Sequence, residues 1–142
     1  MSSSAMESDE EARVIGLLKR LPELANRDSD LVRRGAYVHD DILIGIGAHR
    51  CYVRIAGGRV EEIETRPQRM RSAAFSIIGS ADAWSRFWQR IPAPGWHDLF
   101  AMNKRGHITI EGNLLTFMQH LQYFKDLLAL PRSLSETSPN VR

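Results

Sequence analysis

The segment formed by residues 75–130 constrains the fold of this chain more than any other part of the sequence. It begins with a short apolar strand and ends with a long apolar helix that stops at Pro131. Between them the pattern indicates a Trp-rich helix, a second helix and a short strand at 107–111. These helices carry more large apolar side chains than one pair of short strands can cover, and the segment has almost no residues arranged for catalysis. The pattern favours a protein that holds an apolar molecule over one that transforms it.

Length and composition indicate one ordinary globular domain. The chain has 142 residues, 43% of them hydrophobic and 25% charged, which is typical of a soluble globular protein. A net charge of +2 gives no reason to expect a nucleic-acid partner. The first residues lack the basic and apolar regions of a signal peptide, and no apolar run has the length of a membrane span. We therefore expect a cytoplasmic protein with no integral membrane segment.

Residues 1–7 are predicted to be disordered, and a single domain is expected over 8–131. Ser8 and Glu11 form a capping box, which predicts that a helix begins there and continues to about residue 25. A polar break follows at 26–30. The apolar side chains of this helix recur at spacings of three and four residues, which places them on one face; they are Val14, Leu17, Leu18, Leu21 and Leu24.

Alternating side chains predict the strands that follow the first helix. Apolar residues occupy every second position over 42–46 and again over 51–55. Gly57 and Gly58 tolerate positive φ, so they predict a tight hairpin into a third, more polar strand at 59–65. A fourth strand then opens the apolar segment described above.

Three helices are expected in the second half of the chain. Ser80 is placed to cap the first, which ends at Pro92. A second helix is expected from about 95–102. Asn113 is placed to cap the last helix, which is predicted to run without a break to about residue 130, and residues 132–142 are expected to form a flexible tail. The first of these helices carries a stripe of large apolar side chains, Trp84, Phe87, Trp88 and Ile91.

From about residue 34 to residue 130 the chain resembles the lipid-binding domain of sterol carrier protein type two. The resemblance rests on the Gly-Gly hairpin and on the strand 75–78 that enters a capped helix at 79–84. It rests most on a pattern further along the chain. That pattern is Phe100-Ala101-Met102, then Lys104-Arg105-Gly106, then the strand His107-Ile108-Thr109-Ile110-Glu111, which ends at Gly112-Asn113 before the last helix.

This resemblance implies an α+β fold, with a five-stranded, mostly antiparallel sheet and helices packed on one face. The family forms an apolar tunnel between the sheet and the helices, and the tunnel takes sterols, fatty acids or fatty acyl-CoA. Two features of this chain depart from the family. Residues 92–96 enlarge the region between two helices, and Asn113 stands where the family usually has an acidic residue. The ligand of this chain is therefore not carried over from the family.

The aromatic stripe has two interpretations, the wall of a ligand cavity and a closed core. An amphipathic helix buries such a face in both cases. Buried indole N–H groups need partners, which favours a ligand-filled or partly wet site, and methionine suits a pliable wall. The residues predicted to line the ligand site are Trp84, Phe87, Trp88, Leu99, Phe100, Met102, Phe117, Met118, Leu121 and Phe124.

No pattern in the sequence predicts catalysis, a cofactor or a metal site. His97 and Asp98 are adjacent, but adjacent residues on a helix do not face each other. The five histidines lack metal-ligand spacing, and a single cysteine offers no ligand set. The loop with Arg66, Arg69 and Arg71 is either a contact for anionic lipid headgroups or a solvated charge run, and the second interpretation is favoured.

Two functions are consistent with these observations. The first is non-enzymatic binding or transfer of an apolar ligand (a sterol, a fatty acid or a fatty acyl-CoA), driven by burial of apolar surface. The second is an accessory or interaction module without a free ligand. Such a module would be a homodimer that uses the last helix, or a partner of a lipid-modifying enzyme. A small enzyme acting on an apolar substrate is the least favoured interpretation.

Overall fold

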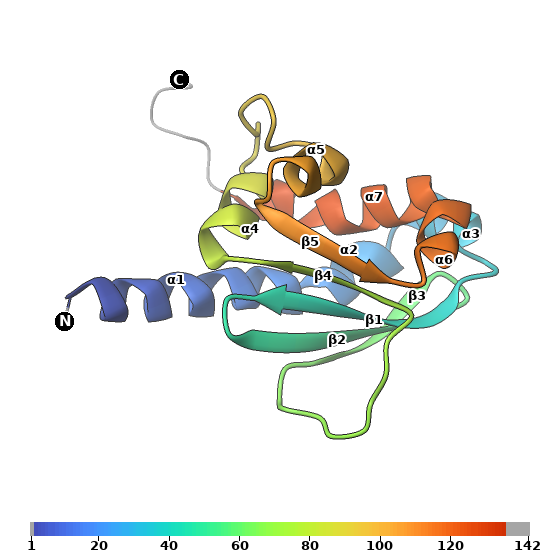
Figure 1. Cartoon of the computed structure of the whole chain (residues 1–142). Coiled ribbons are helices and arrows are strands. Elements are labelled where there is room, and N and C mark those ends of the chain that lie inside the picture. The colour runs from blue at the N-terminus through green and yellow to red at the C-terminus, as the bar shows by residue number, and fades with distance from the viewer. Residues whose placement is uncertain (1, 136–142) are drawn as a thin grey trace.

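The computed structural model describes the backbone of residues 2–135 and the side chains of residues 8–135. One sheet and a layer of helices make up this part of the chain (Figure 1). The strands are β1 (His39–Ile46), β2 (His49–Ala56), β3 (Arg59–Glu64), β4 (Phe75–Gly79) and β5 (Ile108–Gly112). The helices are α1 (Ser2–Lys19), α2 (Leu21–Asn26), α3 (Ser29–Arg34), α4 (Ala81–Phe87), α5 (Leu99–Lys104), α6 (Leu114–Gln119), α7 (Leu121–Ala129) and the 3-10 helix η1 (Leu130–Leu134).

The sheet has the order β3-β2-β1-β4-β5, and the prediction of five mostly antiparallel strands is confirmed. Strands β1, β2 and β3 form an antiparallel meander, and β5 is antiparallel to β4. The pair formed by β1 and β4 is parallel, with Ile42 opposite Phe75. Gly57 and Gly58 have φ values of 60° and 82°, so the hairpin between β2 and β3 forms where the sequence predicts it.

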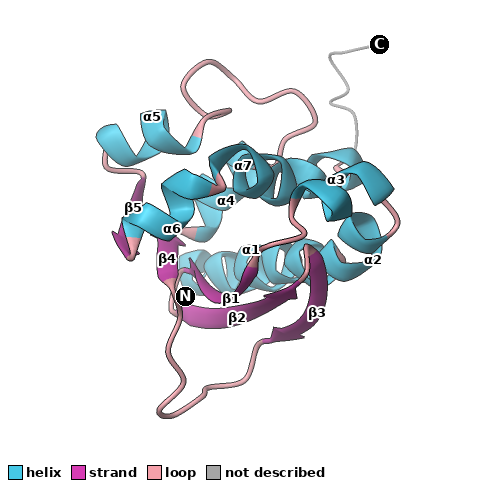
Figure 2. Cartoon of the chain, turned by 90° about the vertical axis from the view of Figure 1, so that its right-hand side faces the viewer, coloured by secondary structure: helices cyan, strands magenta, loops and turns pink. Residues whose placement is uncertain are grey.

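The core lies between the sheet and the helices, which gather on one face of the sheet (Figure 2). Alternate residues of β1 point into this layer, and Ile42, Ile44 and Ile46 are fully buried. The opposite face of the sheet carries polar and aromatic side chains, among them Arg54 and Tyr52. The sequence prediction of helices on one face is therefore confirmed.

The first predicted helix is present but has different limits. It begins at Ser2, within the segment expected to be disordered, rather than at the capping box of Ser8. It also ends at Lys19, and α2 begins at Leu21. Pro22 explains the break, because proline is favoured in the first turn of a helix and disrupts a helix interior.

Helix α3 begins within the predicted polar break at 26–30 and continues to Arg34. Asp28 caps this helix, with its side chain accepting a hydrogen bond from the Leu31 N–H. Leu31 is the buried residue of the helix. A single buried side chain in six residues leaves no apolar periodicity to detect, which is why the prediction missed the helix.

The last helix is two helices rather than one. His120 has φ −122° and ψ 34°, outside the helical region, so α6 ends and α7 begins in a new direction. Asn113 caps α6 as predicted, accepting a hydrogen bond from the Thr116 N–H. Ser80 likewise caps α4, but that helix ends at Phe87, and Ile91 is 75% exposed instead of extending the aromatic stripe.

The beginning of the expected flexible tail is packed on the domain. Arg132 donates hydrogen bonds to the backbone carbonyls of Phe87 and His97, at 2.8 and 3.0 Å. The Ser135 hydroxyl donates to the Trp88 carbonyl. The rest of the expected tail, residues 136–142, lies outside the described residues.

Candidate functional site

The residues predicted to line a ligand site converge on the interior between sheet and helices, with one exception. Met118 is 53% exposed and lies on the outer side of α6. Phe100 and Leu121 are partly buried and pack against the core. The fully or nearly fully buried members of the predicted set are Trp84, Phe87, Trp88, Leu99, Met102, Phe117 and Phe124.

Trp84 of α4 and Trp88, the residue that caps its C-terminus, have hydrogen-bond partners for their indole N–H groups without a ligand. The Trp84 indole N–H donates to the Gly45 carbonyl at 2.8 Å, and the Trp88 indole N–H donates to the Leu128 carbonyl at 2.6 Å. Their rings lie 5.0 Å apart. The argument that unpaired indoles favour a wet site therefore does not hold, because backbone carbonyls provide both partners.

A second aromatic group lies beneath α6. The ring of Phe75 is 4.9 Å from the rings of Phe117 and of Phe124, and Phe100 is 5.6 Å from Phe117. These side chains fill the space in which the family resemblance places a tunnel. No tunnel is shown by the described residues, so the tunnel stays a prediction.

Helix α6 covers this aromatic group with only one of its apolar faces. Phe117 is buried, whereas Leu114, Leu115 and Met118 are 48%, 67% and 53% exposed. The helix lies at one end of the molecule, beside α7 and next to the end of β5 (Figure 1). Three adjacent exposed apolar side chains on a two-turn helix form an unpartnered surface.

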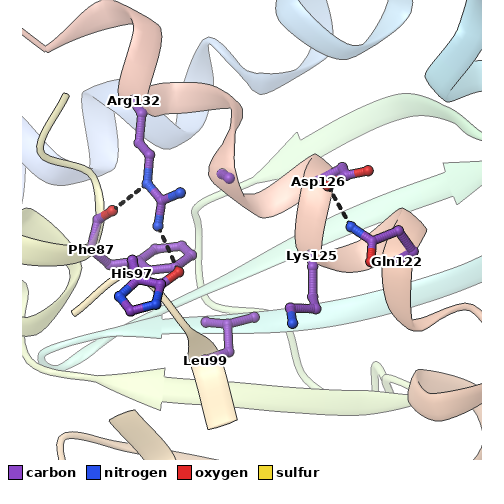
Figure 3. Close-up of a pocket in the computed structure, with 8 residues that line it drawn as sticks. Phe87, His97, Leu99, Gln122, Lys125, Asp126 and Arg132 are labelled. Atoms are coloured by element: carbon purple, nitrogen blue, oxygen red, sulfur yellow. Dashed lines mark hydrogen bonds between the residues drawn. The ribbon is translucent and has the colours of Figure 1, made fainter. Parts of the chain in front are cut away.

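A small pocket reaches the surface between α7 and the segment that leads into α5 (Figure 3). Its volume is about 130 Å3. Phe87 and Leu99, two of the predicted ligand-lining residues, contribute buried side chains to it. The remaining lining residues are polar or small: His97, Gln122, Lys125, Asp126, Ala129 and Arg132.

Arg132 is the least neutralised cation of this pocket. Its guanidinium group bonds to two backbone carbonyls and lies 4.6 Å from the centre of the Phe87 ring. No carboxylate of the described residues forms an ion pair with it. Burial lowers the pKa of Arg132, as expected for a cation without a neighbouring negative charge, although an arginine stays protonated in any ordinary buffer.

The carboxylates at the pocket already have partners. Asp98 forms an ion pair with Lys125 at 3.1 Å and caps α5 by accepting from the Ala101 N–H. Burial raises the pKa of Asp98, but the hydrogen bonds from Lys125 and Ala101 outweigh it and hold the pKa below its ordinary value. Asp126 accepts from Arg34 at 2.8 Å and from Gln122 at 2.9 Å.

This arrangement gives no support to the general-base interpretation of His97 and Asp98. The Asp98 carboxylate is directed to Lys125 and to the start of α5, where both of its oxygens are used. Within residues 8–135, no group of three His, Cys, Asp or Glu side chains is arranged to hold a metal. Cys51 is buried in the core, and burial raises the pKa of its thiol.

Sequence reasoning identified the apolar side of this pocket and missed the polar side. Arg132 directly follows Pro131, at the position where the sequence predicts the tail to begin, so no pattern predicts its anchoring bonds. Lys125 and Gln122 are polar residues of the last predicted helix, and the sequence predicts no function for them. Gln122 is one helical turn from Asp126, and Lys125 is one turn from Ala129, but these spacings match no known binding motif. Only the fold shows that these residues lie near His97.

Comparison with solved structures identifies the architecture. No family model and no curated protein matches the chain. The crystal structure of a sterol carrier protein 2 superposes with a TM-score of 0.65, covering 82% of this chain and 94% of that one, at 10% sequence identity. The chain has the sterol carrier protein 2 fold.

Two further structures with this fold agree. A conserved hypothetical protein of Thermus thermophilus, described as a candidate sterol carrier protein, gives a TM-score of 0.64 over 87% of this chain and 89% of its own, at 11% identity. The sterol carrier protein domain 2 of Helicoverpa armigera gives 0.57 over 84% and 88%, also at 11% identity. At such identities the sterol carrier protein 2 likeness establishes the fold, and it confirms the resemblance seen in the sequence. None of the helices in the described part of the chain has both the length and the apolar character needed to span a bilayer.

Proposed function

We propose that this chain binds and carries an apolar ligand between its sheet and its helices, without catalysing a reaction, and that it works in the cytoplasm. One observation carries the proposal. The pocket of Figure 3 has Phe87 and Leu99 as its apolar wall, and both side chains continue into the buried aromatic interior. A sterol, a fatty acid or a fatty acyl-CoA would gain roughly 25 cal/mol for each Å2 of apolar surface removed from water.

Ligand uptake requires the packed interior to open. The side chains of Trp88 and Phe124 are fully buried, so an acyl chain enters only if neighbouring elements separate. Helix α6 is the element best suited to move. It has two turns, it follows Gly112 with φ 107°, and it ends at the non-helical His120.

The first test is native mass spectrometry of the purified chain, followed by solvent extraction and uptake assays with a fluorescent fatty acid and a fluorescent sterol. We expect about one lipid per chain, or saturable uptake of one of the two probes. A protein that contains no lipid and takes up neither probe would contradict the carrier function.

A matched pair of variants tests whether the pocket is part of the path. Ala129→Trp places a large ring in a pocket of about 130 Å3, so it should reduce uptake at least tenfold. Glu61→Trp adds the same ring at an exposed position of β3, outside the pocket lining, and should leave uptake unchanged. Equal uptake by both variants would show that the ligand reaches the interior elsewhere.

The exposed apolar surface of α6 favours a second candidate, the interaction module. A homodimer or a complex with a lipid-modifying enzyme would cover Leu114, Leu115 and Met118. The same native mass spectrum reports the oligomeric state. A dimer that the double variant Leu115→Ser/Met118→Ser converts to a monomer would favour this function, and a native monomer would count against the homodimer.

A further inference from the structure

We propose that the pocket between α7 and the segment leading into α5 binds the anionic headgroup, a carboxylate or a phosphate, of an amphiphilic ligand. Arg132 and Lys125 would hold the headgroup while the apolar chain passes Phe87 and Leu99. This inference rests on the proposed function and narrows it, because it favours acidic amphiphiles over neutral sterols.

The charge distribution of the pocket is the first reason to expect an anionic ligand. Asp98 is paired with Lys125, and Asp126 is paired with Arg34. Arg132 has no carboxylate partner among the described residues, so one full positive charge remains at a partly buried site. A desolvated cation without a counter-charge is unfavourable, and an anionic group bound beside it removes that cost.

The unused hydrogen-bond donors of Arg132 and Lys125 are the second reason. Arg132 uses Nε and Nη2 on the Phe87 and His97 carbonyls, and no protein acceptor in the described part of the chain takes a bond from Nη1. Lys125 has three N–H donors, and Asp98 accepts from one of them. In Figure 3 the Arg132 side chain extends toward His97, and the Lys125 side chain extends toward Leu99; both cations line the pocket. Free donors on both cations suit the several lone pairs of a carboxylate or a phosphate.

The size of the pocket is the third reason, because it suits a headgroup better than a whole ligand. At about 130 Å3 it is much smaller than the roughly 300–1,000 Å3 that a whole ligand of drug size occupies. It therefore accommodates one end of a ligand. The stacking of Arg132 on the Phe87 ring, at 4.6 Å, holds the guanidinium group at the boundary between the polar rim and the apolar interior.

The basic loop that the sequence offered for the same role is less suitable. Arg66 pairs with Glu64, and Arg71 pairs with both Asp41 and Glu62. Arg66 and Arg71 are therefore already neutralised. Arg69, the third arginine of the loop, is exposed, so salt and water screen its charge and the loop attracts anions less strongly than the pocket does.

The experiment compares three ligands that share a sixteen-carbon chain (about the length of a common fatty acid): palmitate, hexadecyl phosphate and 1-hexadecanol. Their Kd values are measured by calorimetry below the micellar concentration. We expect at least one of the two anionic ligands to bind tenfold or more tightly than the alcohol. The two anions distinguish a carboxylate site from a phosphate site.

Three variants locate the effect. Arg132→Gln should abolish the preference for anions, and Lys125→Gln should reduce it. Arg59→Gln, on the exposed part of β3, should retain it in full. Binding of 1-hexadecanol should be the same in all four proteins, which also shows that the variants are folded. Since Lys125→Gln leaves the backbone bonds of Arg132 intact, it maintains the test if Arg132→Gln does not fold.

The outcomes separate this inference from the function on which it rests. If the native chain binds the three ligands equally, the headgroup site is wrong and the carrier function stands. A preference that persists in both pocket variants would also overturn the site. If none of the ligands binds, the headgroup site is wrong, and the carrier function is then decided by the lipid extraction and the sterol probe.

Discussion

Two partly buried arginines, Arg71 and Arg132, occupy opposite sides of the sheet and have opposite electrostatic surroundings. Arg71 lies over the open face, where it pairs with Asp41 at 3.0 Å and with Glu62 at 3.1 Å and stacks on Tyr52. Arg132 stacks on Phe87, and among the described residues its guanidinium group bonds to backbone carbonyls alone. Arg71 is therefore neutralised by neighbouring carboxylates, whereas Arg132 has no carboxylate partner in the part of the chain that the structure describes.

The pKa shifts of the two side chains follow this difference. Burial lowers the pKa of Arg71, but the hydrogen bonds and charges of Asp41 and Glu62 outweigh burial, so the pKa is raised. For Arg132, burial acts alone and the pKa is lowered. Arg71 is therefore part of the stabilising framework, whereas Arg132 retains a positive charge that a ligand can use.

Arg71→Met should have the largest effect on stability. It leaves Asp41 with one cation instead of two and removes the ring contact with Tyr52. We expect the free energy of unfolding to fall by about 2–3 kcal/mol, somewhat less than for a fully buried ion pair. Urea unfolding followed by tryptophan fluorescence measures the change. A loss below about 0.5 kcal/mol, the range of an ordinary surface substitution, would show that this cluster is not structural.

Acidification should reduce the difference in unfolding free energy between the native chain and Arg71→Met. Burial raises the pKa of Asp41, but the bonds from Arg54 and Arg71 bring it below its ordinary value. A carboxyl with a lowered folded pKa stabilises the fold above its unfolded pKa of about 3.9, and this contribution is lost as the pH falls below that value. Between about pH 5 and pH 3 the difference in unfolding free energy should therefore decrease. A constant difference would show that the Asp41 charge is not the partner that matters.

Arg132→Met should cost less, about 1 kcal/mol. The variant loses hydrogen bonds to the Phe87 and His97 carbonyls but also removes an uncompensated buried charge, and the two effects partly cancel. The same unfolding experiment measures it. If Arg132→Met destabilises the chain more than Arg71→Met, the contrast between the two arginines is reversed.

Arg69→Met should have the smallest effect and serves as the control for the others. Arg69 is exposed and forms no ion pair with the rest of the described chain. Its replacement should change the unfolding free energy by less than about 0.5 kcal/mol and should preserve the full acid dependence.

The strands and the capped turns were predictable from the sequence because their signals are local. The Gly57-Gly58 pair sets positive φ at the hairpin, and Ser80 and Asn113 each cap a helix within three residues. The buried positions of the Trp-rich helix follow from spacing alone as far as Trp88. The signals for these elements therefore lie within a few neighbouring residues, which is why they can be identified without the tertiary contacts.

The remaining features depend on contacts between distant segments. No proline or glycine marks the break at His120, and Met118, which is predicted to line the ligand site, lies on the exposed side of α6. The anchoring of Arg132 joins residues that are 45 and 35 positions apart. A pattern of residue types does not show which residues far apart in the sequence meet in the fold, so the polar half of the pocket could not be predicted.

The parallel pairing of β1 with β4 at the centre of the sheet affects how the protein folds. The meander β1-β2-β3 forms from neighbouring segments, but β4 joins it across the long loop after β3, with Ile42 opposite Phe75. Until β4 docks, β1 is an edge strand with unpaired N–H and C=O groups and three large apolar side chains. Newly made chains are therefore at greatest risk of aggregation between the completion of the meander and the arrival of β4.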